Sequence, residues 1–541
     1  MDRDRRLSRH NRLPRSFIGA SAVLPVAFLA VFYVWPFGTL VTEAIGVRAF
    51  TDTLGDERTV DVLWFTTWQA VVSTLATLVL GVAPAWVLSR FAFPGRRLLL
   101  GLLTSVFVLP TVVVGAAFVA LLPDSLDRSV WAIIAAHVVF NLAVVVRTVG
   151  VVWGQLPDDL GHAAATLGAN RAQVFRTVTL PLLRPALLAA GAIVFMFTFT
   201  SFGVVRVLGG VRHATIEVEV WRRATQLGDV SGAAVLAVLQ LVVLAAVVAW
   251  TGWSQRRHGR SVERRRPRAR RRPTARQAPF VAGISVVTAA VIGLPLLALV
   301  ERSFRSGDGY SLAAWRSLSG AQIRRGLDLG VDPLDALQRS ATTMVWATAL
   351  AVVLGGAAVI AIDALGRSGR LLDVGLMLPL GTSAVTIGFG MLITFDHSPV
   401  DWRGEWWLVP VGHALVAVPF VVRGAIGVVR SIPPDLGNAA ATLGASPLRA
   451  WTSTTLPLLR QPIANGAGLA AAISLGEFGA TSFLSRTGSD TLPVAIERLL
   501  GRTGAVFQAQ AFALSTILAA ATVTIVLLVD LGSGDNRALG R

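Results

Sequence analysis

Long apolar runs separated by short polar segments dominate the pattern along this chain. The first half contains runs at residues 17–40, 62–89, 97–122, 130–153, 184–208 and 232–254. The second half contains runs at residues 279–301, 340–364, 370–395, 406–430, 461–485 and 507–531. A helix needs about 20 apolar residues to cross a bilayer, so each run is long enough. The pattern predicts an all-α integral membrane protein of about twelve transmembrane helices in two groups of six.

One polar segment between two runs occurs twice. It reads PDDLGHAAATLGA at residues 157–169 and PPDLGNAAATLGA at residues 433–445, and each copy continues to TLPLLR, at 179–184 and 455–460. The offset between the copies is 276 (444 minus 168), without insertion or deletion. A duplication with this arrangement predicts two homologous halves of parallel topology, related by a pseudo-twofold axis along the membrane normal. A translocation path would lie between the halves.

Each copy of the repeated segment has the residues of two short helices joined at a glycine. Pro157 and Pro433 suit the first turn of a helix, and the alanines that follow favour a helix whose small side chains let another protein approach closely. Gly168 and Gly444 favour the left-handed conformation of a helix C-cap. The alternative is a helix that merely stiffens the loop, but the same elbow is kept in both halves while residues 170–178 and 446–454 diverge.

The charge of the chain indicates its orientation. The formal net charge is +18, every basic residue is Arg, and most of the excess lies in residues 1–15 and 255–277. Such runs also occur in nucleic-acid patches, but beside membrane helices they are typical of cytoplasmic segments that contact anionic headgroups. We therefore expect a first unit at 1–254, a basic cytoplasmic linker at 255–277, a second unit at 278–541 and both termini in the cytoplasm. No nucleic-acid partner is expected.

The polar segments 41–61 and 302–339 fall on the outer side in this topology. Each is a candidate docking lip for a partner or, alternatively, an unstructured outer loop.

Enzymatic activity is not expected. The chain has no Lys, which a P-loop requires, no Cys, and no metal-binding spacing among its seven His. No catalytic, metal or cofactor site is predicted. A duplicated ion-coupled secondary transporter remains an alternative, although it would not need the repeated elbows.

A second aligned pair lies near the end of the fifth run of each half. Ser201-Phe202-Gly203 aligns with Glu477-Phe478-Gly479 at the same offset. We interpret Ser201, Phe202, Glu477 and Phe478 as candidate pathway or gate residues. An acid in an apolar run usually faces a partner or an aqueous path, so Glu477 would either contact a cationic substrate or stabilise helix packing and gating.

The repeated segment resembles the signature cytoplasmic loop of the permeases of binding-protein-dependent ABC importers: Ala-Ala, three residues, Gly, then eleven residues to Leu-Pro. The resemblance implies a cell inner-membrane permease of two units whose coupling helices dock on a separate, homodimeric ATPase. It also implies that the permease receives a solute from an extracytoplasmic binding protein. The implied coupling residues are Asp159, His162, Ala163, Ala164, Gly168, Asp435, Asn438, Ala439, Ala440 and Gly444. The family usually has Glu where this chain has His162 and Asn438, so a salt bridge from that Glu is not expected.

Two units fused in one chain resemble the permeases of thiamine and ferric-iron importers. Leu208-Gly209-Gly210 and Ala214-Thr215-Ile216-Glu217 are similar to thiamine permeases, whereas the segment around Glu477 is as similar to molybdate and iron permeases. The resemblance favours thiamine as the transported solute, with ferric iron as the alternative.

Overall fold

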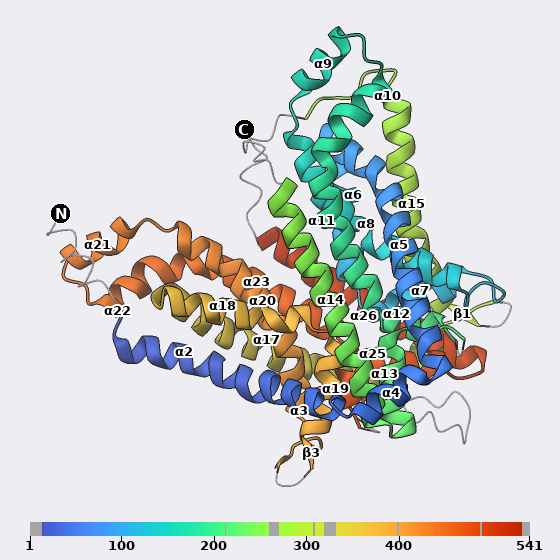
Figure 1. Cartoon of the computed structure of the whole chain (residues 1–541). Helices are drawn as coiled ribbons and strands as arrows, with labels where there is room; N and C mark the ends of the chain where they lie inside the picture. Colours follow the sequence, from blue (N-terminus) through green and yellow to red (C-terminus); the bar gives the residue numbers. More distant parts are fainter. Residues whose placement is uncertain are drawn as a thin grey trace.

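The chain is almost entirely helical. The computed structural model describes residues 13–210, 212–258, 270–306, 309–318, 332–397, 400–486 and 489–532. Two arms of helices diverge from a shared base in Figure 1. We call the ends that carry α9 (Asp158–Thr166) and α21 (Pro434–Thr442) the tips, and the end where α12 (Gly203–Leu208), α13 (Ile216–Arg222) and α25 (Leu492–Leu500) lie the base.

The remaining elements follow in chain order. Those of the first unit are α2 (Arg15–Leu29), η1 (Ala30–Val34), α3 (Trp35–Ala44), α4 (Val47–Gly55), α5 (Glu57–Arg90), α6 (Arg96–Val108), α7 (Thr111–Leu121), α8 (Val130–Gln155), α10 (Arg171–Val174), η2 (Phe175–Thr179), α11 (Leu180–Phe199), η3 (Arg223–Leu227) and α14 (Val230–His258). Those of the second unit are α15 (Ala278–Ser303), β1 (Arg305–Ser306), β2 (Gly309–Tyr310), α16 (Ala313–Ser317), α17 (Pro333–Ala364), α18 (Arg367–Gly381), α19 (Ala384–Thr394), β3 (Asp396–His397), β4 (Val400–Asp401), α20 (Leu408–Ser431), α22 (Pro447–Ala450), η4 (Trp451–Thr455), α23 (Leu456–Gly476), α24 (Thr481–Leu484) and α26 (Ala505–Gly532). The η elements are π-helical turns, and β1–β2 and β3–β4 are short antiparallel hairpins.

The expected membrane helices are largely confirmed. In the described residues, nine continuous helices are long and apolar enough to cross a membrane, and two further pairs qualify as bent spans. The helix α23 occupies the place of the remaining expected span, but Arg460, Gln461 and Asn465 make its first half polar.

The structure corrects four expected spans. Residues 97–122 and 370–395 do not form straight helices. The chain bends by 109° between α6 and α7 and by 98° between α18 and α19. Pro110 disfavours a helical Leu109 before it, and Ser383 caps the new helix by accepting from the Val385 amide at 3.1 Å. The expected spans 184–208 and 461–485 are broken as well, since α11 ends at Phe199 and α23 ends at Gly476.

The basic linker meets the tip of the first unit. The helix α14 continues to His258, and residues 259–269 lie outside the described part of the chain. The Ala92 amide donates to the Arg271 carbonyl at 2.9 Å, and the Arg271 amide donates to the Arg90 carbonyl at 3.2 Å. The part of the linker that the structure describes is therefore attached to the end of α5. The middle of the expected basic linker lies outside the described residues.

The first helix of each unit packs against the other unit. Phe28, Leu29 and Tyr33 of α2 and η1 belong to a buried cluster formed by helices of the second unit. Ile292 and Leu299 of α15 belong to the cluster that contains most of the first unit. The two units are therefore joined twice, once through α2 and once through α15.

One buried hydrogen bond fixes the exchanged N-terminal helix. The Tyr33 hydroxyl lies 2.6 Å from Thr382 Oγ1, at the bend between α18 and α19. Thr382 Oγ1 also donates to the Leu378 carbonyl at 3.1 Å. Removing the tyrosine hydroxyl would therefore cost one hydrogen bond without leaving the threonine unpaired.

We predict that Tyr33→Phe lowers the free energy of unfolding by about 1 kcal/mol, the usual net value of one buried hydrogen bond. The thermal unfolding midpoint of the purified chain in detergent measures it. Tyr310→Phe is the matched control, because Tyr310 is the only other tyrosine and its side chain is 75% exposed. Equal midpoints for Tyr33→Phe and the unmodified chain would contradict the assigned bond.

Candidate coupling loops and gate

The two repeated segments fold into the same elbow, one at each tip (Figure 1). Gly168 and Gly444 have φ of 87° and 82°, in the left-handed region that favours glycine. The Ala169 amide donates to the Ala164 carbonyl at 3.1 Å, and the Ala445 amide donates to the Ala440 carbonyl at 3.1 Å. Together with the Gly168 and Gly444 amides, which bond the carbonyls of Ala165 and Ala441 at 3.0 Å, these contacts form a Schellman motif at each copy. The predicted glycine C-caps are confirmed.

The second helix of each elbow begins at a side-chain cap. Asn170 and Gln173 form a reciprocal capping box at the start of α10, which satisfies two amides at the helix N-terminus. Ser446 takes the equivalent position before α22 and accepts from the Arg449 amide. The elbows therefore agree in geometry although their second helices differ in sequence.

Each elbow exposes apolar side chains at matched positions. Leu167 is 88% exposed and Leu443 is 89% exposed, and Leu160 and Leu436 are 45% and 43% exposed. The other candidate coupling residues lie on the same elbows: Asp159, His162, Ala163, Asp435 and Ala439 are exposed, and Ala164, Asn438 and Ala440 are half-buried. The elbows thus present two nearly identical, partly apolar surfaces.

At the base, an aromatic contact joins the two units. Phe202 and Phe478 are equivalent residues, and their rings stack with centroids 5.0 Å apart and an interplanar angle of 25°. Both side chains are buried, and both follow directly on the breaks that end α11 and α23. Because equivalent residues meet each other, the pseudo-twofold axis passes close to this pair.

The glycines after these phenylalanines bring two helices together. A Cβ on Gly203 would lie 2.2 Å from Thr111 Oγ1, and one on Gly479 would lie 3.0 Å from the Val385 amide nitrogen. Both contacts are to the starts of the second helices of the bent pairs, α7 and α19. In each unit the phenylalanine therefore supplies a ring to the interface between the units. The glycine after it lets the bent helix pair pack closely against the end of the broken helix.

Two equivalent histidines, which sequence reasoning missed, stabilise the breaks. In the first unit His137 Nε2 lies 2.8 Å from Ser201 Oγ. In the second unit His413 Nδ1 lies 2.9 Å from Ser474 Oγ, and its Nε2 lies 2.7 Å from Thr481 Oγ1. The two histidines are 276 residues apart, so applying the repeat offset to every polar residue in the apolar runs would have found them.

Glu477 is enclosed by hydrogen bonds rather than open to a path. Its carboxylate accepts from the Ala480 amide at 2.9 Å and from the Thr481 amide at 3.0 Å, and Oε2 lies 3.2 Å from His413 Nε2. The residue is 7% exposed. This geometry favours the packing and gating interpretation of Glu477 over contact with a substrate. In the first unit the residue equivalent to Glu477 is Ser201, which carries no charge.

The motif that suggested a resemblance to thiamine permeases, residues 214–217, is buried at the base in its last three residues. Thr215 Oγ1 donates to the Ser201 carbonyl at 2.9 Å, the Ile216 amide donates to Thr66 Oγ1 at 3.0 Å, and Gln240 Nε2 donates to Glu217 Oε1 at 2.8 Å. The motif therefore holds α13 against the broken end of α11. An ion pair between Arg206 and Glu497, 2.9 Å apart, adds a further contact between the units in this layer.

Some known proteins are similar to most of this chain, and others are similar to one unit of it. The thiamine transport system permease protein ThiP of Brucella suis is 27% identical over 503 residues, which cover 86% of each chain. ThiP of Brucella melitensis is 26% identical over 495 residues, with the same coverage. The putative 2-aminoethylphosphonate transport system permease protein PhnV of Salmonella typhimurium is 31% identical over 197 residues, which cover 36% of this chain and 73% of that protein.

A family model matches the chain twice, once in each unit. The matched residues are 77–260 and 357–532, and they include both elbows and both broken helices. These relatives are transport permeases rather than enzymes, and the apolar helices place the chain in the membrane as a multi-pass protein. The chain belongs to the family of binding-protein-dependent transport system inner membrane components.

Proposed function

We propose that this chain forms the complete translocation path of an ABC importer and that α9 and α21 are its contacts with the ATPase. The matched exposure of Leu167 and Leu443 at the two tips carries this proposal. Two nearly identical surfaces suit two copies of one partner, so the proposed ATPase is a homodimer. ATP hydrolysis belongs to that partner, because this chain has no Lys for a P-loop.

The proposed orientation has the tips in the cytoplasm. Arg90, Arg96 and the described end of the basic linker lie together at the tip of the first unit, where Arg96 Nε donates to the Leu88 carbonyl at 2.8 Å. Clustered arginines are typical of the cytoplasmic side. The base, with the Phe202–Phe478 pair, then faces the binding protein.

A continuous helix connects each elbow to the gate. Residues Arg171–Phe199 form 29 helical residues without interruption, a rod about 43 Å long at 1.5 Å per residue. In the second unit α22, η4 and α23 connect Pro447 to Gly476 in the same way. Movement of the tips on the ATPase would therefore be transmitted to Phe202 and Phe478, which we propose close the path.

Thiamine is the proposed substrate. The support is the similarity to ThiP over 86% of the chain, together with the resemblance of the sequence around Thr215 to thiamine permeases. A second candidate is 2-aminoethylphosphonate, which the similarity of one unit to PhnV favours. Since selectivity of such importers would be set by the binding protein, its ligand is the quantity to measure.

We predict that Leu167→Gln, Leu443→Gln and the double variant weaken binding of the ATPase and reduce transport-stimulated ATP hydrolysis. Burying a leucine contributes about 1.5–3 kcal/mol, so each change should raise the dissociation constant by roughly 10- to 150-fold. Binding of the purified ATPase to the chain in nanodiscs measures it. The exposed positions should leave the thermal unfolding midpoint unchanged.

Leu126→Gln is the control for this test, because Leu126 is 45% exposed and lies in the turn between α7 and α8. ATPase affinity unchanged in the double variant would reject the coupling assignment. Loss of affinity in Leu126→Gln as well would show that the effect is not specific to the elbows.

For the substrate, we predict that the binding protein that works with this chain binds thiamine, with calorimetric heat that saturates near one thiamine per protein. Parallel titrations with 2-aminoethylphosphonate and ferric iron distinguish the alternatives. If the binding protein binds 2-aminoethylphosphonate or ferric iron tightly and does not respond to thiamine, that ligand becomes the proposed substrate. The assignment of the chain as a permease would not change.

A further inference from the structure

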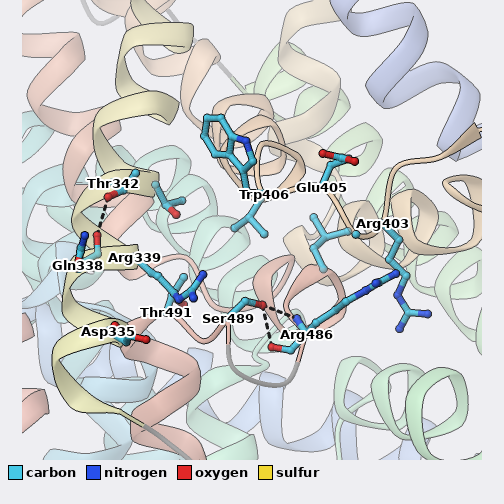
Figure 2. Close-up of a pocket in the computed structure, with 14 residues that line it drawn as sticks. Asp335, Gln338, Arg339, Thr342, Arg403, Glu405, Trp406, Arg486, Ser489 and Thr491 are labelled. Carbon is cyan, nitrogen blue, oxygen red and sulfur yellow. Dashed lines mark hydrogen bonds between the residues drawn. The ribbon is translucent and has the colours of Figure 1, made fainter. Parts of the chain in front are cut away.

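A charged pocket opens at the base of the second unit. Its volume is about 570 Å³, and it lies between α17, the turn before α20 and the connection from α24 to α25. Figure 2 shows Arg339 and Asp335 on α17, Arg486 and Ser489 on the connection, and Trp406, Glu405 and Arg403 on the turn before α20. Residues from three elements thus surround one polar space.

The arginines of this pocket are incompletely neutralised. Among the described residues, Arg339 and Arg486 make no ion pair, and Arg403 pairs with Asp396 at 2.7 Å. The Arg403 Nε atom is buried without a hydrogen-bond partner in the described structure. Arg486 reaches across to the turn before α20, where its Nη1 lies 3.1 Å from the place of a Cβ on Gly404. Arg339 also interacts electrostatically with Asp490. Arginines from three separate elements therefore converge on the pocket, and of these only Arg486 has no acidic partner among the described residues.

A buried hydroxyl group also lacks a partner at the same place. Thr491 lines the pocket and is 4% exposed, and its Oγ1 has no hydrogen bond within the described part of the chain. Unsatisfied buried polar atoms are uncommon in folded proteins. The hydroxyl and the arginine Nε are donors suited to an oxygen-rich anion.

The first unit fills the corresponding space with an aromatic side chain. The Ile216 amide donates to Thr66 Oγ1 and the Leu492 amide donates to Ser340 Oγ, so α5 and α17 correspond at an offset of 274 (340 minus 66). Arg339 then corresponds to Phe65, whose ring packs on His213 with centroids 5.3 Å apart. The arginine at this position of α17 therefore has an aromatic counterpart in the first unit.

An apolar stripe leads away from the pocket along α17. Thr342 lines the pocket, and Trp346, Ala349 and Val353 follow on the same helical face. Trp346 and Val353 are 53% and 56% exposed, and Trp346 packs edge-on against Trp406, with ring centroids 5.9 Å apart. From Thr342 to Val353 the stripe is about 16 Å long at 1.5 Å per residue, close to the roughly 15 Å thickness of one hydrocarbon leaflet.

The corresponding face of α5 is also apolar and exposed. At the 274 offset the corresponding residues are Val72, Leu75 and Val79, all aliphatic and exposed by 38%, 57% and 74%. Such a face on a membrane helix is typical of contact with lipid acyl chains. The tryptophans beside the pocket suit the boundary between headgroups and hydrocarbon.

We propose that this pocket binds a membrane phospholipid, with the headgroup phosphodiester held by Arg339, Arg403 and Arg486 and an acyl chain on the Trp346–Val353 stripe. The phosphate oxygens accept from the guanidinium groups and from Thr491. Glu405 and Asp335 at the margin suit an ammonium headgroup such as that of phosphatidylethanolamine. The site belongs to the membrane environment of the permease and is independent of the transported solute.

The test measures phospholipid binding to the delipidated full chain in detergent by native mass spectrometry. Phosphatidylethanolamine and phosphatidylglycerol are added separately. We expect one tightly held phospholipid, and an apparent affinity about tenfold lower when Arg339→Gln and Arg486→Gln are combined, because each charge-assisted hydrogen bond contributes strongly. Thr342→Phe should reduce binding too, since it fills the pocket without changing charge.

Arg212→Gln combined with Arg305→Gln is the matched control. Both arginines are exposed and lie outside the pocket, so this pair removes the same charge and should leave phospholipid binding unchanged. Equal binding in the Arg339/Arg486 variant and the control would overturn the proposal.

Two further outcomes would also overturn it. Displacement of the bound phospholipid by millimolar inorganic phosphate would identify a site for a soluble anion. Unchanged lipid binding with weakened attachment of the extracytoplasmic binding protein would identify a docking pocket for an acidic side chain of that protein.

Discussion

The stacked pair Phe202 and Phe478 is the contact on which the arrangement of the two units depends. Each ring follows the break of a long helix, and each is positioned by the glycine after it and by a bent neighbouring helix. An unbroken helix would carry these residues farther along its own axis instead of turning the chain at the interface. The breaks are therefore the structural condition for a contact between equivalent residues at the pseudo-twofold axis.

The two units support this contact by different chemistry. In the first unit a histidine–serine contact lies beside the break. In the second unit His413 meets the carboxylate of Glu477, which also accepts hydrogen bonds from two backbone amides. A buried carboxylate is tolerated only where donors surround it, and at Glu477 they do. The duplicated fold is thus symmetric in its backbone at the Phe202–Phe478 pair and asymmetric in its polar contacts. The charged pocket beside α17 adds a second difference between the units.

The sequence predicted the features that depend on local pattern. The apolar runs predicted the membrane helices, and the repeated Ala-Ala and Gly residues predicted the two elbows with left-handed glycines. The sequence did not predict the bends at Pro110 and Ser383 or the breaks after Phe199 and Gly476, because an apolar run has the same hydropathy whether its helix is straight or interrupted. The exchange of α2 and α15 between units depends on tertiary packing, which no local pattern contains. His137 and His413 could not be predicted from local pattern, because each is a single polar residue inside an apolar run and its partners come from other helices.

The central claim is that the Phe202–Phe478 contact must open for a solute to pass. The chain has no cysteine, so Phe202→Cys combined with Phe478→Cys introduces the only two thiols, and a short bifunctional thiosulfonate can join them. In proteoliposomes that contain the ATPase and the binding protein, we expect solute uptake to stop on cross-linking and to recover on reduction. Each single variant should be insensitive to the reagent. Uptake that continues at full rate in the cross-linked double variant, with linkage verified by mass spectrometry, would contradict the account.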